Sequence, residues 1–223
     1  MTAEYLSLLL ADGRLPTGAH TQSAGVEPAL RHGMRVEDVP AYLRVRLATV
    51  VEVEAAAAVV AGRVWSERFG GRVVEALRAV DDAWRVRTLA DALREASDLL
   101  GRSYLRTAAA VWDLSPLTAT RTPWCRAVVV GVVAAEAGLD AEQTARLVAF
   151  EDVQTVVAAA LKLEPFDPAL GVRWAADAAV AVEALVARVA DARTPDDIPA
   201  HSAPLVEEWG QHHRTSERRL FRA

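Results

Sequence analysis

Residues 140–163 read DAEQTARLVAFEDVQTVVAAALKL, and this stretch decides the class of fold. Asp140 and Gln143 form a capping-box pattern, in which each side chain satisfies a backbone N–H group at the start of a helix. The apolar residues that follow recur at three- and four-residue steps, as they do along one side of a helix. They are Leu147, Phe150, Val157 and Leu161. The pattern predicts a helix from about 140 to 163.

A second set of residues lies on a different face of this predicted helix, within roughly 60° of one another at 100° per residue. The set is Glu151, Thr155, Ala158 and Lys162. Lys162 is the only lysine in a chain with 24 arginines. Its position near the end of the helix is favoured by the helix dipole whether or not the residue has a function.

The remainder of the chain carries the same helical patterning, and alternating strand-like segments bounded by hairpin turns are absent from the sequence. Further helices are expected over about 3–12, from Ser23 as the N-cap to Leu30, from Glu37 to about 69, and over about 72–112, 123–137 and 168–192, with a short one near the C-terminus. Residues 115–123 are expected to form a loop and 192–204 a linker. The prediction is an all-α, single-domain bundle of roughly eight to ten helices over residues 1–223, with 192–223 as linker and C-terminal arm.

Composition limits the classes of function. The chain has 223 residues, 52% of them hydrophobic, and a net charge of −5, which favours a folded protein and disfavours nucleic acid or an anionic membrane as partner. Cys125, the single cysteine, is expected to be a buried, inert thiol. The N-terminus lacks the basic start of a signal peptide, and the longest apolar run, 127–135, is half of the ~18–20 residues that a membrane span needs. These features predict a soluble, cytoplasmic protein.

A polar, glycine-bearing loop near the N-terminus, LPTGAHTQSAGVE at residues 15–27, is the first candidate for function. It could be a catalytic loop, a phosphate cradle or a docking edge for another protein. The sequence has no G-x-S-x-G elbow, and Cys125 has no histidine near it in the chain. A phosphate-binding Gly-Lys-Ser/Thr loop is also absent, since the one lysine is followed by Leu163.

The histidines do not form a ligand pattern. His212 and His213 are adjacent, and neighbours on a helix point about 100° apart, so they rarely share one ion. His20, His32 and His201 are scattered, with no H-x-x-x-H or E-x-x-H spacing. An internal catalytic metal site is therefore not expected, and His20, His212 and His213 are only weak candidate ligands.

Taken singly, the polar residues at both ends have ordinary explanations. A loop histidine such as His20 is often simply exposed, and an acid such as Glu27 is favoured in the first turn of a helix by the dipole. Arginines in the tail RTSERRLFRA, residues 214–223, could be merely solvated.

Three motifs together resemble the UreF family of urease accessory proteins. The first is an N-terminal LP-x-G-G-(aromatic or His)-x-x-S-x-G-(Leu or Ile)-E pattern, matched by Leu15, Pro16, Gly18, His20, Ser23, Gly25 and Glu27. A later lysine-containing turn is matched by Lys162, Leu163, Pro165 and Phe166. A terminal pattern is matched by His213, Thr215, Arg219, Leu220, Phe221 and Arg222. Departures are Ala19 for the second glycine, Glu54 where Asp is common and Arg214 for the tail glutamate.

The resemblance implies a dimeric, non-enzymatic all-α adaptor without a cofactor. Members of the family bridge UreD (also called UreH) and the GTPase UreG, and help to load nickel, as transferred cargo, into apo-urease. The residues implied to bind partners are Pro16, Gly18, His20, Ser23, Gly25, Glu27, Lys162, His213, Arg219, Phe221 and Arg222.

The resemblance also implies specific contacts. We expect the C-terminal tail to pack near loop 15–27, with His20 hydrogen-bonding to Arg222 through a neutral imidazole that protonation would oppose. Lys162 is implied to take part in control of the GTPase, since a long flexible cation can meet an acidic patch on a partner without fixed geometry.

Two other classes of function stay open at this point. A ligand-sensing transcription regulator is often an all-α dimer of this size, but it would need a basic helix-turn-helix. The first 30 residues carry a single arginine, Arg14, against three acids, with Arg31 just beyond. A metalloenzyme using His20, His212 and Glu27 would require those three side chains to meet in space.

Overall fold

The computed structural model describes residues 2–67, 71–215 and 220–221, and these residues form helices without any strand. The all-α prediction is thereby confirmed. The helices are α1 (Ala3–Leu10), α2 (Val26–Arg31), α3 (Val39–Leu47), α4 (Val50–Glu67), α5 (Val73–Arg85), α6 (Asp91–Ala108), α7 (Ser115–Thr118), α8 (Arg126–Glu136), α9 (Ala141–Leu163), α10 (Pro168–Asp177), α11 (Ala179–Val189) and α12 (Pro204–Thr215). Short 3₁₀ helices are η1 (Ala19–Thr21), η2 (Val36–Asp38) and η3 (Pro195–Asp197).

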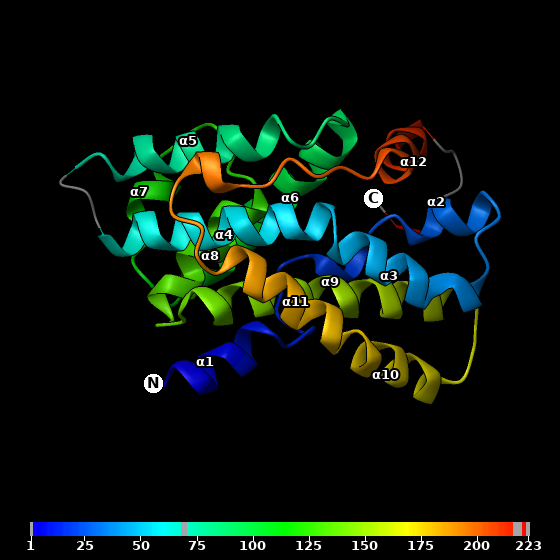
Figure 1. The fold of residues 1–223 in the computed structure, drawn as a ribbon. Coiled ribbons are helices and arrows are strands. Elements are labelled where there is room, and N and C mark those ends of the chain that lie inside the picture. Colours follow the sequence, from blue (N-terminus) through cyan, green and yellow to red (C-terminus); the bar gives the residue numbers. More distant parts are fainter. Residues whose placement is uncertain (1, 68–70, 216–219, 222–223) are drawn as a thin grey trace.

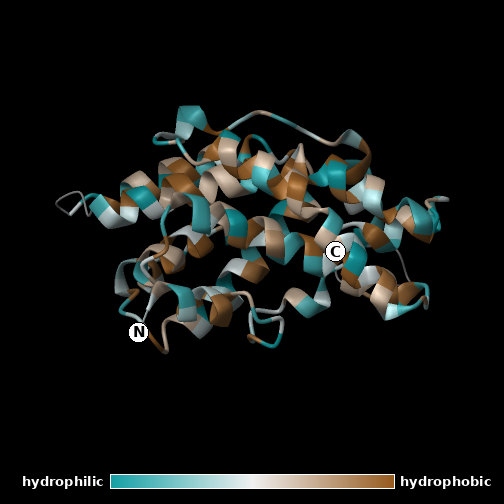
Figure 2. Cartoon of the chain, turned by 60° about the horizontal axis from the view of Figure 1, so that its bottom comes forward, coloured by the Kyte–Doolittle hydropathy of each residue, from teal (hydrophilic) through white to brown (hydrophobic). Residues whose placement is uncertain are grey.

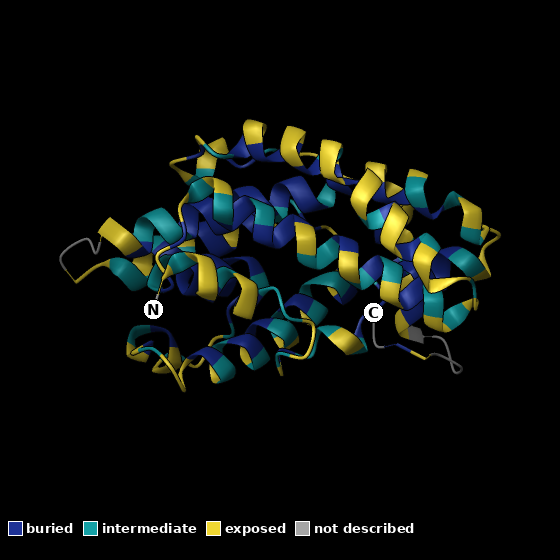
Figure 3. Ribbon diagram, turned by 90° about the horizontal axis from the view of Figure 1, so that it is seen from below, coloured by how far each residue is buried: buried dark blue, intermediate teal, exposed yellow. Residues whose placement is uncertain are grey.

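Helices α4, α8 and α9 pack against one another in the middle of the molecule (Figure 1). Helices α5 and α6 cover one side of this centre, and α10 and α11 lie against α9 on the other. Helix α12 comes from the far end of the chain and packs beside α6 and α2. Hydrophobic segments run through the middle of the bundle (Figure 2), and the outward faces of the helices are exposed while their inward faces are buried (Figure 3).

The contact between α4 and α8 depends on small side chains. Residues 55–58 of α4 are four consecutive buried alanines, and Gly131 of α8 lies against the Ala58 backbone so closely that a methyl group there would overlap the Ala58 carbonyl oxygen. A methyl group on Gly62 would in turn lie 3.0 Å from the Gly131 carbonyl oxygen. The two helix backbones can therefore approach each other directly.

Two other helices cap the N-terminus of α8. Asp81 of α5 is 1% exposed, and its carboxylate accepts a hydrogen bond from the Cys125 backbone N–H at 2.7 Å. The Ser97 hydroxyl of α6 accepts one from the Arg126 N–H at 2.9 Å. These contacts satisfy backbone donors that a helix start leaves unpaired, and they fix α5 and α6 relative to α8.

Several predicted helix ends agree with the structure. Asp140 and Gln143 make both hydrogen bonds of the capping box, at 2.8 and 3.0 Å. Asp167 caps α10 ahead of Pro168. Gly138, with φ of 78°, follows Ala137, the C-cap of α8, close to the predicted helix end.

Three of the long predicted helices are divided. The run from Glu37 to 69 becomes η2, α3 and α4, and the last two separate at Ala48–Thr49, where the Thr49 hydroxyl donates to the Val45 carbonyl. A threonine hydroxyl that bonds four residues back competes with the regular helix pattern. The run 168–192 is divided at Ala178, whose backbone remains right-handed. Partly for this reason, the α-helices in the described residues exceed the predicted eight to ten.

The break in the run 72–112 has a tertiary cause. Helix α5 ends at Arg85 and α6 begins at Asp91, where Glu207 of α12 accepts a hydrogen bond from the Ala90 N–H at 2.6 Å. Gln211 of α12 accepts a second one from the Ala92 N–H at 3.2 Å. The cap is supplied from more than one hundred residues away, so apolar periodicity could not reveal it.

Two local predictions were wrong. Residues 115–123 are not entirely loop, since α7 begins at Ser115, whose N–H donates to the Asp113 carboxylate. Ser23 is not the N-cap of α2, because Gly25 occupies that position with a left-handed φ of 79°. None of the helices in the described residues is long and apolar enough to cross a lipid bilayer.

Replacing Gly131 by Ala tests the α4–α8 contact. Alanine improves helix propensity by about 1 kcal/mol over glycine, but its methyl group meets backbone that cannot rotate away. We expect the cost of the steric overlap to exceed the gain in helix propensity. The free energy of unfolding should then fall by about 1–3 kcal/mol in urea titrations. Gly13→Ala is the matched control, since nothing lies within 4 Å of its added methyl, and it should change stability by less than about 0.5 kcal/mol. Equal stabilities of the two variants would contradict the contact.

Cys125 is fully buried, and burial raises the pKa of its thiol well above the ordinary value. The nucleophile is the thiolate, so native protein should react with a thiol reagent at neutral to mildly alkaline pH only through unfolding. We expect the rate to be at least about a thousandfold below that of the urea-unfolded chain. Rapid labelling of folded protein would show that this thiol is accessible.

Candidate partner-binding site

Left-handed backbone shapes the polar loop at residues 15–27. Gly18, the N-cap of η1, has φ of 84°, and Gly25 has φ of 79°. A methyl group on Gly25 would also lie 2.6 Å from the Tyr42 hydroxyl oxygen, so this position excludes a side chain on two grounds. Ala24, between them, has φ of 50°, an uncommon conformation for a residue with a side chain.

Neighbouring helices hold the loop in place. The Thr107 hydroxyl of α6 donates a hydrogen bond to the Pro16 carbonyl at 3.0 Å. The Tyr42 hydroxyl of α3 donates to the Ala24 carbonyl at 2.7 Å, which stabilises the strained residue. Pro16 and His20 remain exposed, while Ser23 is completely buried. The loop is thus held near both of its ends, while Pro16 and His20 face solvent.

Glu27 joins this loop to the C-terminal tail. Its side chain is 1% exposed, and its two carboxylate oxygens accept hydrogen bonds from the Leu220 N–H at 2.8 Å and the Phe221 N–H at 2.9 Å. Arg31, one turn further along α2, donates to the same carboxylate at 2.6 Å. Hydrogen bonds to a buried charge are the strong ones, so Glu27 is the anchor of the tail. Leu220 and Phe221 of the tail therefore lie beside the end of loop 15–27, as expected.

His213 of α12 closes the same cluster. It is 2% exposed, and its Nε2 lies 3.1 Å from the Phe221 carbonyl oxygen and 3.5 Å from Glu27 Oε2. Because a carbonyl oxygen can only accept, the hydrogen-bond geometry assigns the proton to Nε2. His213 Nδ1 is buried and has no hydrogen-bond partner among the residues that the structure describes.

Lys162 lies beside the anchored tail. Its Nζ is 5.5 Å from the centroid of the Phe221 ring, within the range of a cation–π interaction. Phe221 is 4% exposed, whereas Lys162 and Leu220 are exposed. The three sequence motifs thus meet: Glu27 from the first, Lys162 from the second, and Phe221 with His213 from the third.

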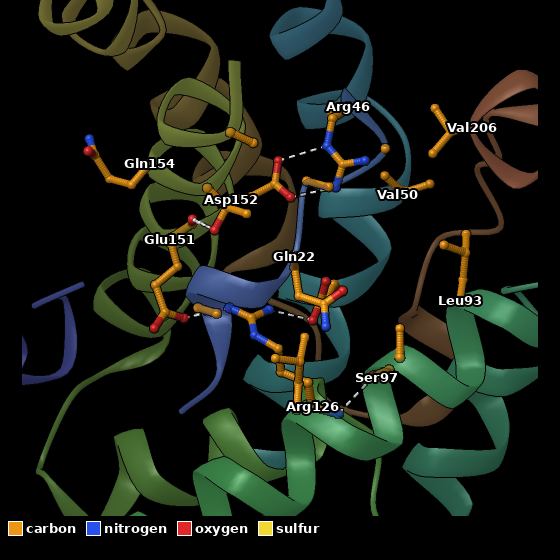
Figure 4. A pocket seen from close by; sticks show the side chains of 18 of the residues that line it. Gln22, Arg46, Val50, Leu93, Ser97, Arg126, Glu151, Asp152, Gln154 and Val206 are labelled. Atoms are coloured by element: carbon orange, nitrogen blue, oxygen red, sulfur yellow. Dashed lines mark hydrogen bonds and ion pairs between the residues drawn. The ribbon is translucent and has the colours of Figure 1, made fainter. Parts of the chain in front are cut away.

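A cavity of about 500 Å³ opens between the loop, α3, α4, α6 and α9 (Figure 4). His20, Lys162 and Phe221 all contribute to its lining. Val50, Leu93 and Val206 form apolar parts of the wall. The cavity is therefore continuous with the loop and tail described above.

Two arginines form the charged part of the cavity wall: Arg46, which is buried, and Arg126, whose side chain is 13% exposed. Arg46 of α3 makes a two-pronged ion pair with Asp152 of α9, at 2.9 and 2.5 Å. Burial works against the charge of Arg46, but the Asp152 carboxylate outweighs it and raises the pKa of the guanidinium. The pair stands on the wall of the cavity in Figure 4.

Arg126, at the start of α8, lies between two carboxylates. Its Nη1 is 2.5 Å from Glu54 of α4, and its Nη2 is 2.5 Å from Glu151 of α9. Burial raises the pKa of Glu151, although the neighbouring Arg126 opposes that effect. One arginine thereby links three helices at the cavity.

Sequence reasoning did not anticipate the roles of Arg46, Arg126 and Asp152. Of the acidic residues that pair with these arginines, Glu151 was predicted to share a helix face with Lys162. Glu54 was identified only as a departure from the family motif. The one available signal was an arginine opening an otherwise apolar helix, in RAVVVGVV at 126–133. A buried arginine of that kind needs a carboxylate partner, but the sequence cannot say which one.

The other residues of the predicted partner-binding site are placed as follows, or lie outside the described residues. Arg219 and Arg222 lie outside the described residues, and with them the expected His20–Arg222 contact. His212 is exposed whereas His213 is buried, so the adjacent histidines do face different surroundings. Glu27 contacts His213, not His212 as a metalloenzyme site would need. Within the part of the chain that the structure describes, no group of three or more His, Cys, Asp or Glu side chains could hold a metal ion.

The fold and the site define an all-α protein in which an N-terminal loop, a C-terminal tail and one lysine are brought together beside a cavity. Comparison with known proteins gives this class a name. The UreF family model matches residues 34–179, and the chain belongs to the UreF family of urease accessory proteins.

Relatives cover the chain almost from end to end. The urease accessory protein UreF of Mycobacterium sp. (strain JLS) is 35% identical over 225 residues, covering 99% of each chain. That of Mycobacterium marinum is 33% identical over 227 residues, again covering 99% of each. That of Mycobacterium tuberculosis (strain H37Rv) is 36% identical over 176 residues, 76% of this chain and 77% of the relative. The resemblance inferred from three short motifs is confirmed, and it replaces the transcription-regulator alternative.

Glu27→Gln tests the anchor. Glutamine offers one acceptor oxygen in place of two charged ones, so the tail amides lose at least one charge-assisted hydrogen bond, of about 1.5–3 kcal/mol. We expect the amides of Leu220 and Phe221 to exchange with solvent at least about tenfold faster, measured by hydrogen exchange.

Glu142→Gln is the matched control for this experiment. Glu142 also lies in the first turn of a helix, but its side chain is 65% exposed and pairs with Arg146 across 3.7 Å. It should leave exchange at the tail unchanged. The anchor would be refuted if the two variants gave the same exchange rates.

Proposed function

We propose that this protein is a non-catalytic adaptor of urease maturation, which bridges UreD (UreH) and the GTPase UreG and assists GTP-dependent delivery of nickel to apo-urease. The role is that implied by membership of the UreF family. In this proposal the protein works in the cytoplasm, as a homodimer within the complex, and nickel passes through the complex as cargo.

One observation supports the proposal above the others: residues from both ends of the chain converge on one surface. Glu27 fixes the tail backbone, Phe221 packs beside Lys162, and His20 stays exposed on the same cavity rim. A surface assembled from several segments can hold its shape while a partner binds, which lowers the entropic cost of association.

The proposed contact residues fall into exposed residues and residues that shape the surface. His20, Pro16 and Lys162 are exposed and would touch a partner directly. Gly18, Ser23, Gly25, Glu27, His213 and Phe221 would act by shaping the loop and tail. Arg219 and Arg222 are proposed as contacts on the motif match alone.

Size-exclusion chromatography with light scattering tests the bridging role. The protein is mixed with the UreD and UreG of its own organism, with and without GTP and nickel. A joint species containing all three chains is the expected result. A chain that elutes alone in every mixture would overturn the adaptor proposal.

Lys162→Met tests the contribution of the Lys162 charge to partner binding, apart from the rest of the surface. Methionine keeps an unbranched chain of similar length but lacks the charge that would meet an acidic partner. We expect the same fold by circular dichroism and a loss of at least about tenfold in UreG retention or urease activation, as for a charge pair at an interface. Arg173→Met on α10 removes an exposed cation elsewhere and is expected to match wild type. Wild-type behaviour of Lys162→Met in both assays would remove Lys162 from the site.

A further inference from the structure

A second groove lies away from the loop and the tail. It has a volume of about 510 Å³ and runs between α6 and the segment 117–124, which includes the end of α7. Its α6 lining starts at Gly101 and ends at Ala109, just past the last turn. At 100° per residue, this face of α6 is nearly opposite the one that lines the first cavity, at Leu93, Ser97 and Leu100.

Three arginines border this second groove. Arg102 and Arg106 lie one turn apart on α6, and Arg121 faces them from the segment after α7. All three are exposed. Among the described residues, none of the three makes an ion pair, although many arginines elsewhere in the chain do. Asp98, one turn before Arg102, pairs instead with Arg85 at 2.6 Å.

A fourth arginine makes the opposite wall rigid. Arg78 of α5 donates hydrogen bonds to the Thr122 carbonyl at 2.6 Å and the Pro123 carbonyl at 2.8 Å. Its guanidinium carbon also lies 3.3 Å from the centroid of the Trp124 ring. These contacts attach residues 122–124 to α5 and so support this wall of the groove without a bound partner.

We propose that this groove binds an acidic segment of a partner protein, with two carboxylates received by Arg102 and Arg106. The two arginine side chains start about 6 Å apart, as i and i+4 residues on a helix do. In an extended peptide, residues i and i+2 point to the same side about 7 Å apart. The segment that matches this spacing has two acidic residues separated by one residue of any type. Arg121 of the groove would lie near one end of the bound segment.

The length of the groove agrees with such a segment. Eight residue steps along α6, from Gly101 to Ala109, span about 12 Å, which accommodates three or four residues of extended chain. Apolar residues line the groove between the charges: Leu105 is partly exposed, while Leu117 and Trp124 form its floor and are 1% and 2% exposed. A guanidinium group that makes no ion pair with the described residues can bind a partner's carboxylate through two hydrogen bonds. No existing ion pair has to break for this to happen.

Overall charge favours a peptide over nucleic acid. The chain has a net charge of −5, which repels a long polyanion, whereas a short acidic segment meets mainly the local cluster of three arginines. Apolar walls also suit a protein segment better than a phosphate backbone, whose contacts are charged and solvated.

Fluorescence anisotropy on the whole purified protein tests the proposal, at about 50 mM salt to limit screening. The probe is a fluorescein-labelled peptide with two Glu residues separated by one Ala, and its analogue carries Gln at both acidic positions. Single-stranded DNA of equal charge and inorganic phosphate are used as competitors. The protein variants are R102E/R106E, R121E and, as a matched charge reversal on an exposed arginine of α10, R173E. Circular dichroism confirms that each variant is folded.

The expected result is that the Glu peptide binds at least about tenfold tighter than its Gln analogue. R102E/R106E should lose at least about tenfold in affinity and R121E a smaller factor, while R173E stays within about twofold of wild type. Equal binding of both peptides, or equal affinities of R102E/R106E and R173E, would overturn the proposal. Displacement by DNA or by phosphate at lower concentration than by unlabelled Glu peptide would instead assign the groove to that ligand. Since no urease component is present, the outcome is independent of the adaptor role.

Discussion

The close approach of α4 and α8 is the constraint on which the rest of the structure depends. Ala58 and Gly131 meet backbone to backbone, which is possible only because neither residue adds bulk at the contact. Buried alanines and valines of both helices then surround this contact, as close packing favours. With this pair fixed, α9 covers one side and α5 and α6 the other, and residues of these helices line the cavity and the second groove.

Ion pairs between the central helices restrict how these helices can pack against one another. Arg126 pairs with Glu54 and Glu151, and Arg46 pairs with Asp152. A buried ion pair contributes little net stability, because desolvation offsets most of the attraction, but an unpaired partner is costly. Any rotation or slide of α9 against α3, α4 or α8 would leave such a charge alone, so the pairs exclude alternative packings of helices that are otherwise uniformly apolar.

The link between Glu27 and the tail joins residues almost two hundred positions apart in the chain. Fixing such distant segments costs conformational entropy, and the burial of Phe221 and the charged hydrogen bonds offset that cost. Glu27 thereby connects Leu220 and Phe221 of the tail directly to α2 and to the loop before it. In the proposed adaptor role, one partner touching the tail and another touching the loop would sense each other through this carboxylate.

The sequence by itself determined the helical class, several helix ends and the family, because these depend on local patterns and short motifs. Helix caps such as Asp140 and Asp167 are made by neighbours in the chain, so they could be predicted. The division between α5 and α6 and the anchoring role of Glu27 could not, because their hydrogen-bond partners lie more than one hundred residues away. The charged walls of the cavity were equally hidden, since the sequence offers thirty acidic residues as partners for Arg126. Only the tertiary structure decides such pairings, because it alone sets which distant charges are desolvated together.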